Sequence, residues 1–142
     1  MTPPNRPATA LGDTEFMRGR LVKAKGFLES AEALFTVGSV DGVLSPTSPY
    51  ATSFVDLCVD AGIAAADAIC VKKTGRYSSG GNHNDGVAVL QAATDRSTAK
   101  HLDALVRVKS RAAYSARPVD AADVHNAGVA ARALVAVAED TI

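Results

Sequence analysis

The segment Ser53–Lys73 reads SFVDLCVDAGIAAADAICVKK, and it decides how the rest of the chain can fold. It is rich in Ala, contains no Pro, and its residues recur at helical spacing. At about 100° per residue, Asp56, Asp60 and Asp67 fall within roughly 40° of one another, on one edge of the helix. Every other direction carries apolar or small side chains, so we expect a core helix around which the other segments pack. Three Asp in this segment argue against a membrane span.

The segments on either side predict further helices and two loops. Asp13 or Thr14 can cap a helix that runs to about Val37, and Asp120 can cap the last helix. A third helix is expected from about Gly86 to Arg117, with a candidate break at residues 94–98. Residues 39–50 and 74–86 contain several Gly or Pro residues and are predicted loops. No segment alternates convincingly with the period of a strand.

These segments predict an all-α fold, an antiparallel four-helix bundle whose third helix carries the candidate break. The 142 residues suit one domain, expected over residues 14–142, after a flexible Pro-rich lead-in over residues 1–13. The formal net charge is zero, so no global field attracts nucleic acid or membrane, and such a role must come from a local patch.

Cys58 and Cys70 are the two cysteines of the chain. On one helix they would lie about 18 Å apart along the axis, which is too far for a disulfide bond. Reduced thiols indicate a reducing compartment, and the first residues have no apolar signal core. We therefore expect a cytoplasmic location and no membrane association.

The predicted third helix carries the most suggestive group of side chains. One face carries Lys100, Asp103, Arg107, Arg111 and Tyr114, with Lys109 nearby. Guanidinium groups can hold phosphate in bidentate fashion, and a tyrosine can stack on a base. We name Arg107, Lys109, Arg111 and Tyr114 the cationic ridge and predict that it binds phosphate or nucleic acid. The alternative is a solvated face of ion pairs, with Tyr114 packed against the next helix.

The second candidate site is catalytic and consists of Arg76 and His83 on the Gly-rich loop. Histidine titrates near neutral pH and can transfer protons, while arginine can hold a phosphate. Alternatively, His83 caps or braces the loop. We expect no metal site, because the Asp edge of the core helix offers too few oxygen ligands for a hard cation. No cofactor motif is present; KKTGR does not have the order of a P-loop.

Taken in order, five segments resemble the HEPN superfamily, small helical-bundle domains found beside minimal nucleotidyltransferases and in prokaryotic defence and toxin–antitoxin systems. The similar segments are RLVKAKGFLESAEAL, VDAGIAAADAICVKKTGR, GGNHNDGVAVL, KSRAAYS and VDAADVHNAGVAARALVAVAED. The resemblance extends from about Thr14 to Asp140. It implies a homodimer with a cleft between subunits, in which the ribonuclease branch uses an Arg followed a few residues later by a His, usually without a metal.

Three functions follow from the residues and the resemblance. The first is a dimeric module that binds RNA or a nucleotide through the cationic ridge, as the partner of a nucleotidyltransferase or an antitoxin. The second is a metal-independent ribonuclease that uses His83 with Arg76 or Arg111. The third is a helical protein–protein adaptor. The first is favoured because no His follows Arg111 at the position of the ribonuclease branch.

Overall fold

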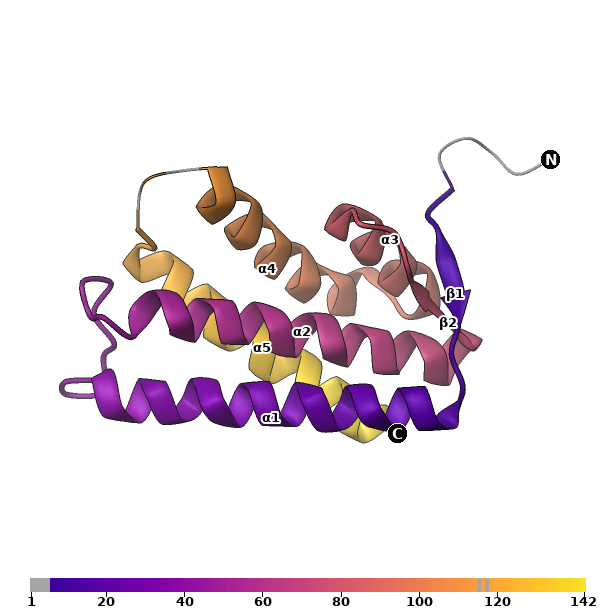
Figure 1. Cartoon of the computed structure of the whole chain (residues 1–142), viewed down its shortest axis with the longest axis horizontal. Helices are drawn as coiled ribbons and strands as arrows, with labels where there is room; N and C mark the ends of the chain where they lie inside the picture. Colours follow the sequence, from indigo (N-terminus) through magenta and orange to yellow (C-terminus); the bar gives the residue numbers. More distant parts are fainter. Residues whose placement is uncertain (1–5, 115, 117) are drawn as a thin grey trace.

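Helix α2 (Ala51–Thr74) contains the predicted core segment and makes contact with all four other helices among the described residues. The computed structural model describes residues 6–114, 116 and 118–142 (Figure 1). The other helices are α1 (Thr14–Gly38), α3 (His83–Ala93), α4 (Arg96–Tyr114) and α5 (Ala121–Thr141), and the strands are β1 (Thr9–Leu11) and β2 (Arg76–Ser78). The predicted all-α character is thus correct for most of the chain, and the core position of α2 is confirmed.

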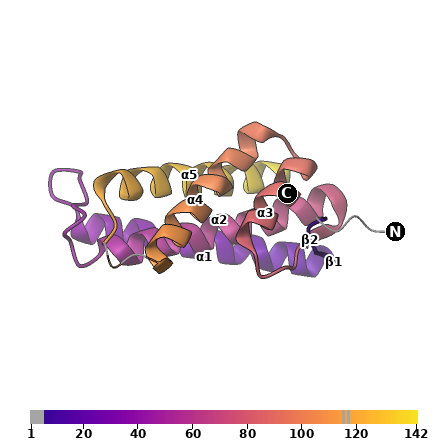
Figure 2. The same ribbon diagram turned by 90° about the horizontal axis from the view of Figure 1, so that it is seen from above.

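Small side chains allow the helices to approach closely. Ala24 and Ala31 of α1 and Ala61, Ala64 and Ala65 of α2 are completely buried. Helix α1 runs opposite to α2, and α4 runs opposite to α5 (Figure 1). Seen from above, α4 runs obliquely across the other helices (Figure 2). Larger side chains from different helices fill the interior, and those that are completely or almost completely buried include Phe54, Ile69, Leu90, Leu105 and Leu134.

The predicted helix ends are confirmed where a side chain caps them. The Asp13 carboxylate accepts a hydrogen bond from the Phe16 backbone N–H at 2.8 Å. Asp120 and Asp123 form a reciprocal capping box at the start of α5. Helix α2 ends at Gly75, whose φ of +75° lies in the left-handed region that glycine adopts without steric cost.

The predicted third helix is two helices. Helix α3 ends at Ala93 and α4 begins at Arg96, which places the interruption inside the predicted break at residues 94–98. Helix α3 also begins earlier than predicted, at His83 rather than near Gly86, because the Asn82 side chain caps it by accepting from the Asn84 N–H at 2.9 Å. His83 therefore lies on the first turn of a helix and not within a loop.

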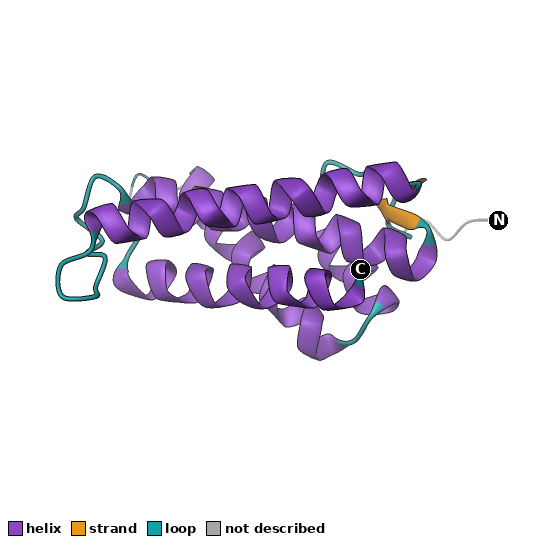
Figure 3. Cartoon of the chain, turned by 90° about the horizontal axis from the view of Figure 1, so that it is seen from below, coloured by secondary structure: helices purple, strands orange, loops and turns teal. Residues whose placement is uncertain are grey.

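Two short strands, which no sequence pattern indicated, lie in the predicted lead-in and in the predicted loop at residues 74–86. Strands β1 and β2 pair antiparallel, with Ala10 opposite Tyr77, at one end of the molecule (Figure 3). The ring of Tyr77 stacks on that of Phe16, with centroids 4.2 Å apart. The predicted lead-in thus contributes β1 to the fold, while residues 1–5 lie outside the described residues. Strands of three residues are too short to show an alternating pattern, so their pairing is not visible in the sequence.

Candidate functional site

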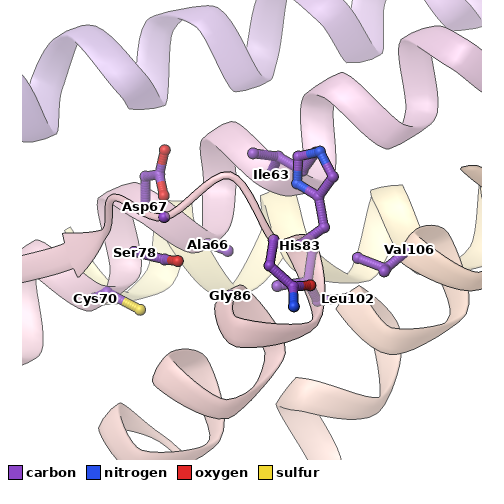
Figure 4. Close-up of a pocket in the computed structure, with 11 residues that line it drawn as sticks. Ile63, Ala66, Asp67, Cys70, Ser78, His83, Gly86, Leu102 and Val106 are labelled. Atoms are coloured by element: carbon purple, nitrogen blue, oxygen red, sulfur yellow. The ribbon is translucent and has the colours of Figure 1, made fainter. Parts of the chain in front are cut away.

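A small pocket lies where α2, α3 and α4 meet the loop that follows β2 (Figure 4). Its volume is about 100 Å³. Four of its lining residues are buried and apolar: Ala66, Cys70, Leu102 and Val106. Its polar lining residues are Asp67, Ser78, Asn82 and His83. An apolar interior with a few converging polar groups is the usual form of a small-molecule site.

His83, at the start of α3, is exposed at the edge of this pocket. Partial burial lowers the pKa of its imidazole below the usual 6.5, and the positive charge of Lys109 on α4 lowers this pKa further. Both effects disfavour the imidazolium form, so His83 is predominantly neutral at pH 7. A neutral imidazole has one nitrogen that donates a hydrogen bond and one that accepts.

Lys109 also acts on the Asp edge of α2. Burial raises the pKa of Asp56, as does the neighbouring charge of Asp60, while the charge of Lys109 lowers it. Lys109 is exposed and near enough to influence both His83 and Asp56. Lys109 is not a lining residue, but it lies one helical turn beyond Val106 on α4, and Val106 lines the pocket.

Asp67 forms the other polar side of the pocket, and its side chain is only 16% exposed. Both Arg20 contacts go to the same carboxylate oxygen, Oδ2: Nε donates at 3.1 Å and Nη2 lies at 3.0 Å. Burial raises the pKa of Asp67 to about 6, although the Arg20 charge and hydrogen bond act in the opposite direction. The second oxygen, Oδ1, accepts no hydrogen bond from the residues that the structure describes. Asp67, on the Asp edge of α2, thus pairs with a basic residue of α1.

The cationic ridge is divided among different partners. Arg107 forms an ion pair with Asp103, one turn away on α4, at 2.8 Å. Arg111 forms ion pairs with Asp120 and with Asp123, which is almost completely buried. Arg111 thus joins the end of α4 to the capping box of α5. The side chain of Tyr114 lies outside the described residues.

The predicted pair of Arg76 and His83 is distributed over two different elements. Arg76 belongs to β2, and its guanidinium donates to the Thr9 hydroxyl at 2.8 Å and to the Thr9 carbonyl at 3.3 Å. These bonds tie Arg76 to β1. The basic residue that acts on the imidazole of His83 is Lys109.

Sequence reasoning did not identify the pocket itself. Asp67, Ser78 and Asn82 come from α2, β2 and the following loop, and packing brings them to His83. The available signal was that Asp67 belongs to the polar edge of an otherwise apolar helix. Asn82 directly precedes His83 in a loop rich in reactive groups, which was a second signal.

Within the described ranges, no three His, Cys, Asp or Glu side chains gather in a way that could hold a metal ion. Both cysteines are buried and unpaired with one another. None of the described helices has the length and hydropathy needed to cross a bilayer. Comparisons of the chain with protein-family models, with curated proteins and with solved structures found no match. The geometry of the pocket and its surroundings is therefore the basis for assigning a function.

Proposed function

We propose that the chain is a HEPN-like module, an antiparallel four-helix bundle with α3 as an additional short helix, that binds RNA or a nucleotide as a homodimer. Its setting would be a prokaryotic defence or toxin–antitoxin system, with a nucleotidyltransferase or an antitoxin as partner. The observation that carries this proposal is the pocket at the start of α3, with neutral His83 at its edge and the charge of Lys109 nearby.

Phosphate binding at this position has a physical basis. A phosphate near Lys109 gains a charge-assisted hydrogen bond, and the N–H of a neutral imidazole can donate another. The α3 N-terminus adds the favourable end of a helix dipole. Lys109 is the member of the cationic ridge that serves this role best, because Arg107 and Arg111 already have carboxylate partners.

Binding of a fluorescein-labelled single-stranded RNA, measured by fluorescence anisotropy at several salt concentrations, tests this proposal. The affinity should fall as salt rises, because each phosphate contact releases bound counterions. Lys109→Gln should weaken binding and reduce the salt dependence. Lys25→Gln makes the same charge change on the exposed surface of α1 and should leave both unchanged. Absence of binding at low salt, or equal effects of the two substitutions, would refute the proposal.

A metal-independent ribonuclease is the second candidate, and the lowered pKa of His83 favours it. A neutral imidazole can accept the proton of a ribose 2′-hydroxyl while the 2′-oxygen attacks the phosphorus, and Lys109 can stabilise the charge that develops on the phosphate. The bond from phosphorus to the 5′-oxygen then breaks, and the leaving oxygen takes a proton from water. In this second proposal Lys109 takes the place of Arg76 and Arg111 as the partner of His83, because its charge acts on the imidazole while Arg76 and Arg111 are hydrogen-bonded elsewhere. Cleavage of RNA in the presence of a chelator, lost in His83→Ala and retained in Arg76→Ala, would establish this activity. RNA that stays intact with the unmodified protein would exclude it for the substrate used.

A further inference from the structure

The pocket beside His83 can accept a flat ring in addition to a phosphate at its rim. Its buried part is apolar, made by Ala66, Leu102 and Val106, and its exposed rim carries Asn82 and His83. A ring that enters from the rim would cover apolar surface while its sugar and phosphate stay in solvent. This arrangement matches the way in which an unstacked base is held by proteins that bind single strands.

The size of the pocket favours a single ring. An engineered cavity of roughly 150 Å³ holds a benzene molecule. The present pocket, of about 100 Å³, is bordered by exposed residues on one side, so a ring can project partly into solvent. The pocket can therefore enclose only part of a ring, and a pyrimidine would leave less of its surface outside than a purine.

Among the polar lining residues, Asp67 determines which pyrimidine fits, because the Ser78 hydroxyl can both donate and accept a hydrogen bond and so favours neither base. Arg20 occupies only the Oδ2 atom of Asp67, and Oδ1 accepts no hydrogen bond from the described residues. Above its pKa of about 6 the Asp67 carboxylate is ionised and offers acceptors alone, so its complement is a hydrogen-bond donor on the ligand. Cytosine has an amino group at C4, whereas uracil has a carbonyl oxygen at the same position and would place acceptor against acceptor.

We propose that this pocket binds a cytosine base, with the amino group of the base donating to Asp67 Oδ1 and the ring lying between the apolar pocket wall and His83. The proposal rests on the proposed function, since it names the base whose phosphate lies near Lys109. The module would then distinguish nucleotides by their base and not only bind their phosphate charge. Uracil is disfavoured because the carboxylate would face a carbonyl at close range.

Titration of the ¹⁵N-labelled protein with the nucleosides cytidine and uridine, followed by NMR, tests the base pocket apart from phosphate binding, because nucleosides carry no phosphate. Cytidine should bind about tenfold more tightly than uridine, the ratio expected for one hydrogen bond gained against one acceptor mismatch. Its addition should shift the signals of Gly86 and His83. In Asp67→Asn the ratio should fall to about threefold or less, since an amide can donate to uracil as well as accept from cytosine.

A steric variant provides the second measurement. Gly86 lines the pocket, and an added Cβ there would make only ordinary contacts, 3.8 Å or more from Ser78 and Leu102. Gly86→Leu should therefore fold and occupy the pocket, abolishing the cytidine shifts. Gly19→Leu, at a position on α1 with no neighbouring atom within 4 Å, should leave the shifts unchanged.

Equal binding of cytidine and uridine, absence of binding by either, or binding that survives Gly86→Leu would overturn the base pocket. These outcomes are distinguishable from failure of the proposed function. If RNA binds with salt dependence but without preference for cytosine, phosphate binding stands and the pocket proposal is wrong. If cytidine binds and RNA does not, the pocket proposal stands and the proposed phosphate binding is wrong.

Discussion

Gly62 lies where α2 packs closely against α4 and α5, and substituting it tests this packing. A Cβ at this position would lie 2.2 Å from Leu105 Cδ1 and 3.3 Å from Leu134 Cδ1. Both leucines are completely buried, so neither can turn its side chain into solvent. We therefore predict that Gly62→Ala destabilises the protein although alanine is the better helix former.

The expected magnitude is the difference between two opposing effects. Overpacking a well-filled core costs about 1–3 kcal/mol, and replacing a helical Gly with Ala returns about 0.5–1 kcal/mol. The free energy of unfolding should thus decrease by up to about 2.5 kcal/mol. Gly26 provides the matched control, because it lies on α1 with no atom within 4 Å of an added Cβ. Gly26→Ala should increase the free energy of unfolding by about 0.5–1 kcal/mol.

The assay is urea denaturation followed by circular dichroism at the helical band, with the slope of the transition checked for constancy. A double-mutant cycle identifies the cause. Leu105→Ala alone should cost about 2–5 kcal/mol, but in that background Gly62→Ala should become neutral or stabilising, because the clashing atom is absent. Equal stability of Gly62→Ala and Gly26→Ala, or an unchanged cost of Gly62→Ala beside Leu105→Ala, would refute the proposed packing.

Further predictions concern individual charged groups. Burial raises the pKa of Asp67 to about 6, above its value in the unfolded chain, so the folded state binds this proton more tightly. As the pH rises from about 4 to about 6, the free energy of unfolding should therefore decrease by about 2–3 kcal/mol. In Asp67→Asn, the free energy of unfolding measured by urea denaturation at several pH values should not show this decrease. The same decrease in the variant would contradict the assignment to Asp67. NMR titration should give His83 a pKa below 6.5, and this pKa should rise in Lys109→Gln. An unchanged His83 pKa in the variant would show that the charge of Lys109 does not act on the imidazole. Arg111→Ala should lower the melting temperature through loss of its pairing with Asp123 and leave RNA affinity nearly unchanged, whereas a large loss of affinity at constant stability would make Arg111 a binding residue.

The parts of the fold that could be predicted from the sequence depend on local patterns. The burial of α2 follows from its apolar side chains in almost every direction, and the start of α5 follows from Asp120 and Asp123 within one turn. The interruption between α3 and α4 also has a local cause in a polar segment. The pairing of β1 with β2 depends on contacts between distant segments, so three-residue strands gave no usable signal.

The candidate site was less predictable, because helical spacing places residues on one face without showing what each one meets. Arg107 and Arg111 share a face of α4, yet the start of α5 supplies carboxylates that pair with Arg111. Lys109 was grouped with them, and the packing of α3 instead brings its charge near His83. The residues that make the pocket polar belong to separate elements, so only the tertiary structure reveals them together.

The central proposal is that nucleic acid binds at the start of α3 beside Lys109. Its most direct test is a titration of the ¹⁵N-labelled full chain with a short single-stranded RNA, recording backbone amide shifts at low salt. We predict that the largest shifts fall on residues 82–86 and around Lys109, and that they disappear in Lys109→Gln. Shifts confined to other surfaces, or no shifts at RNA concentrations that saturate known RNA-binding domains, would contradict the proposal.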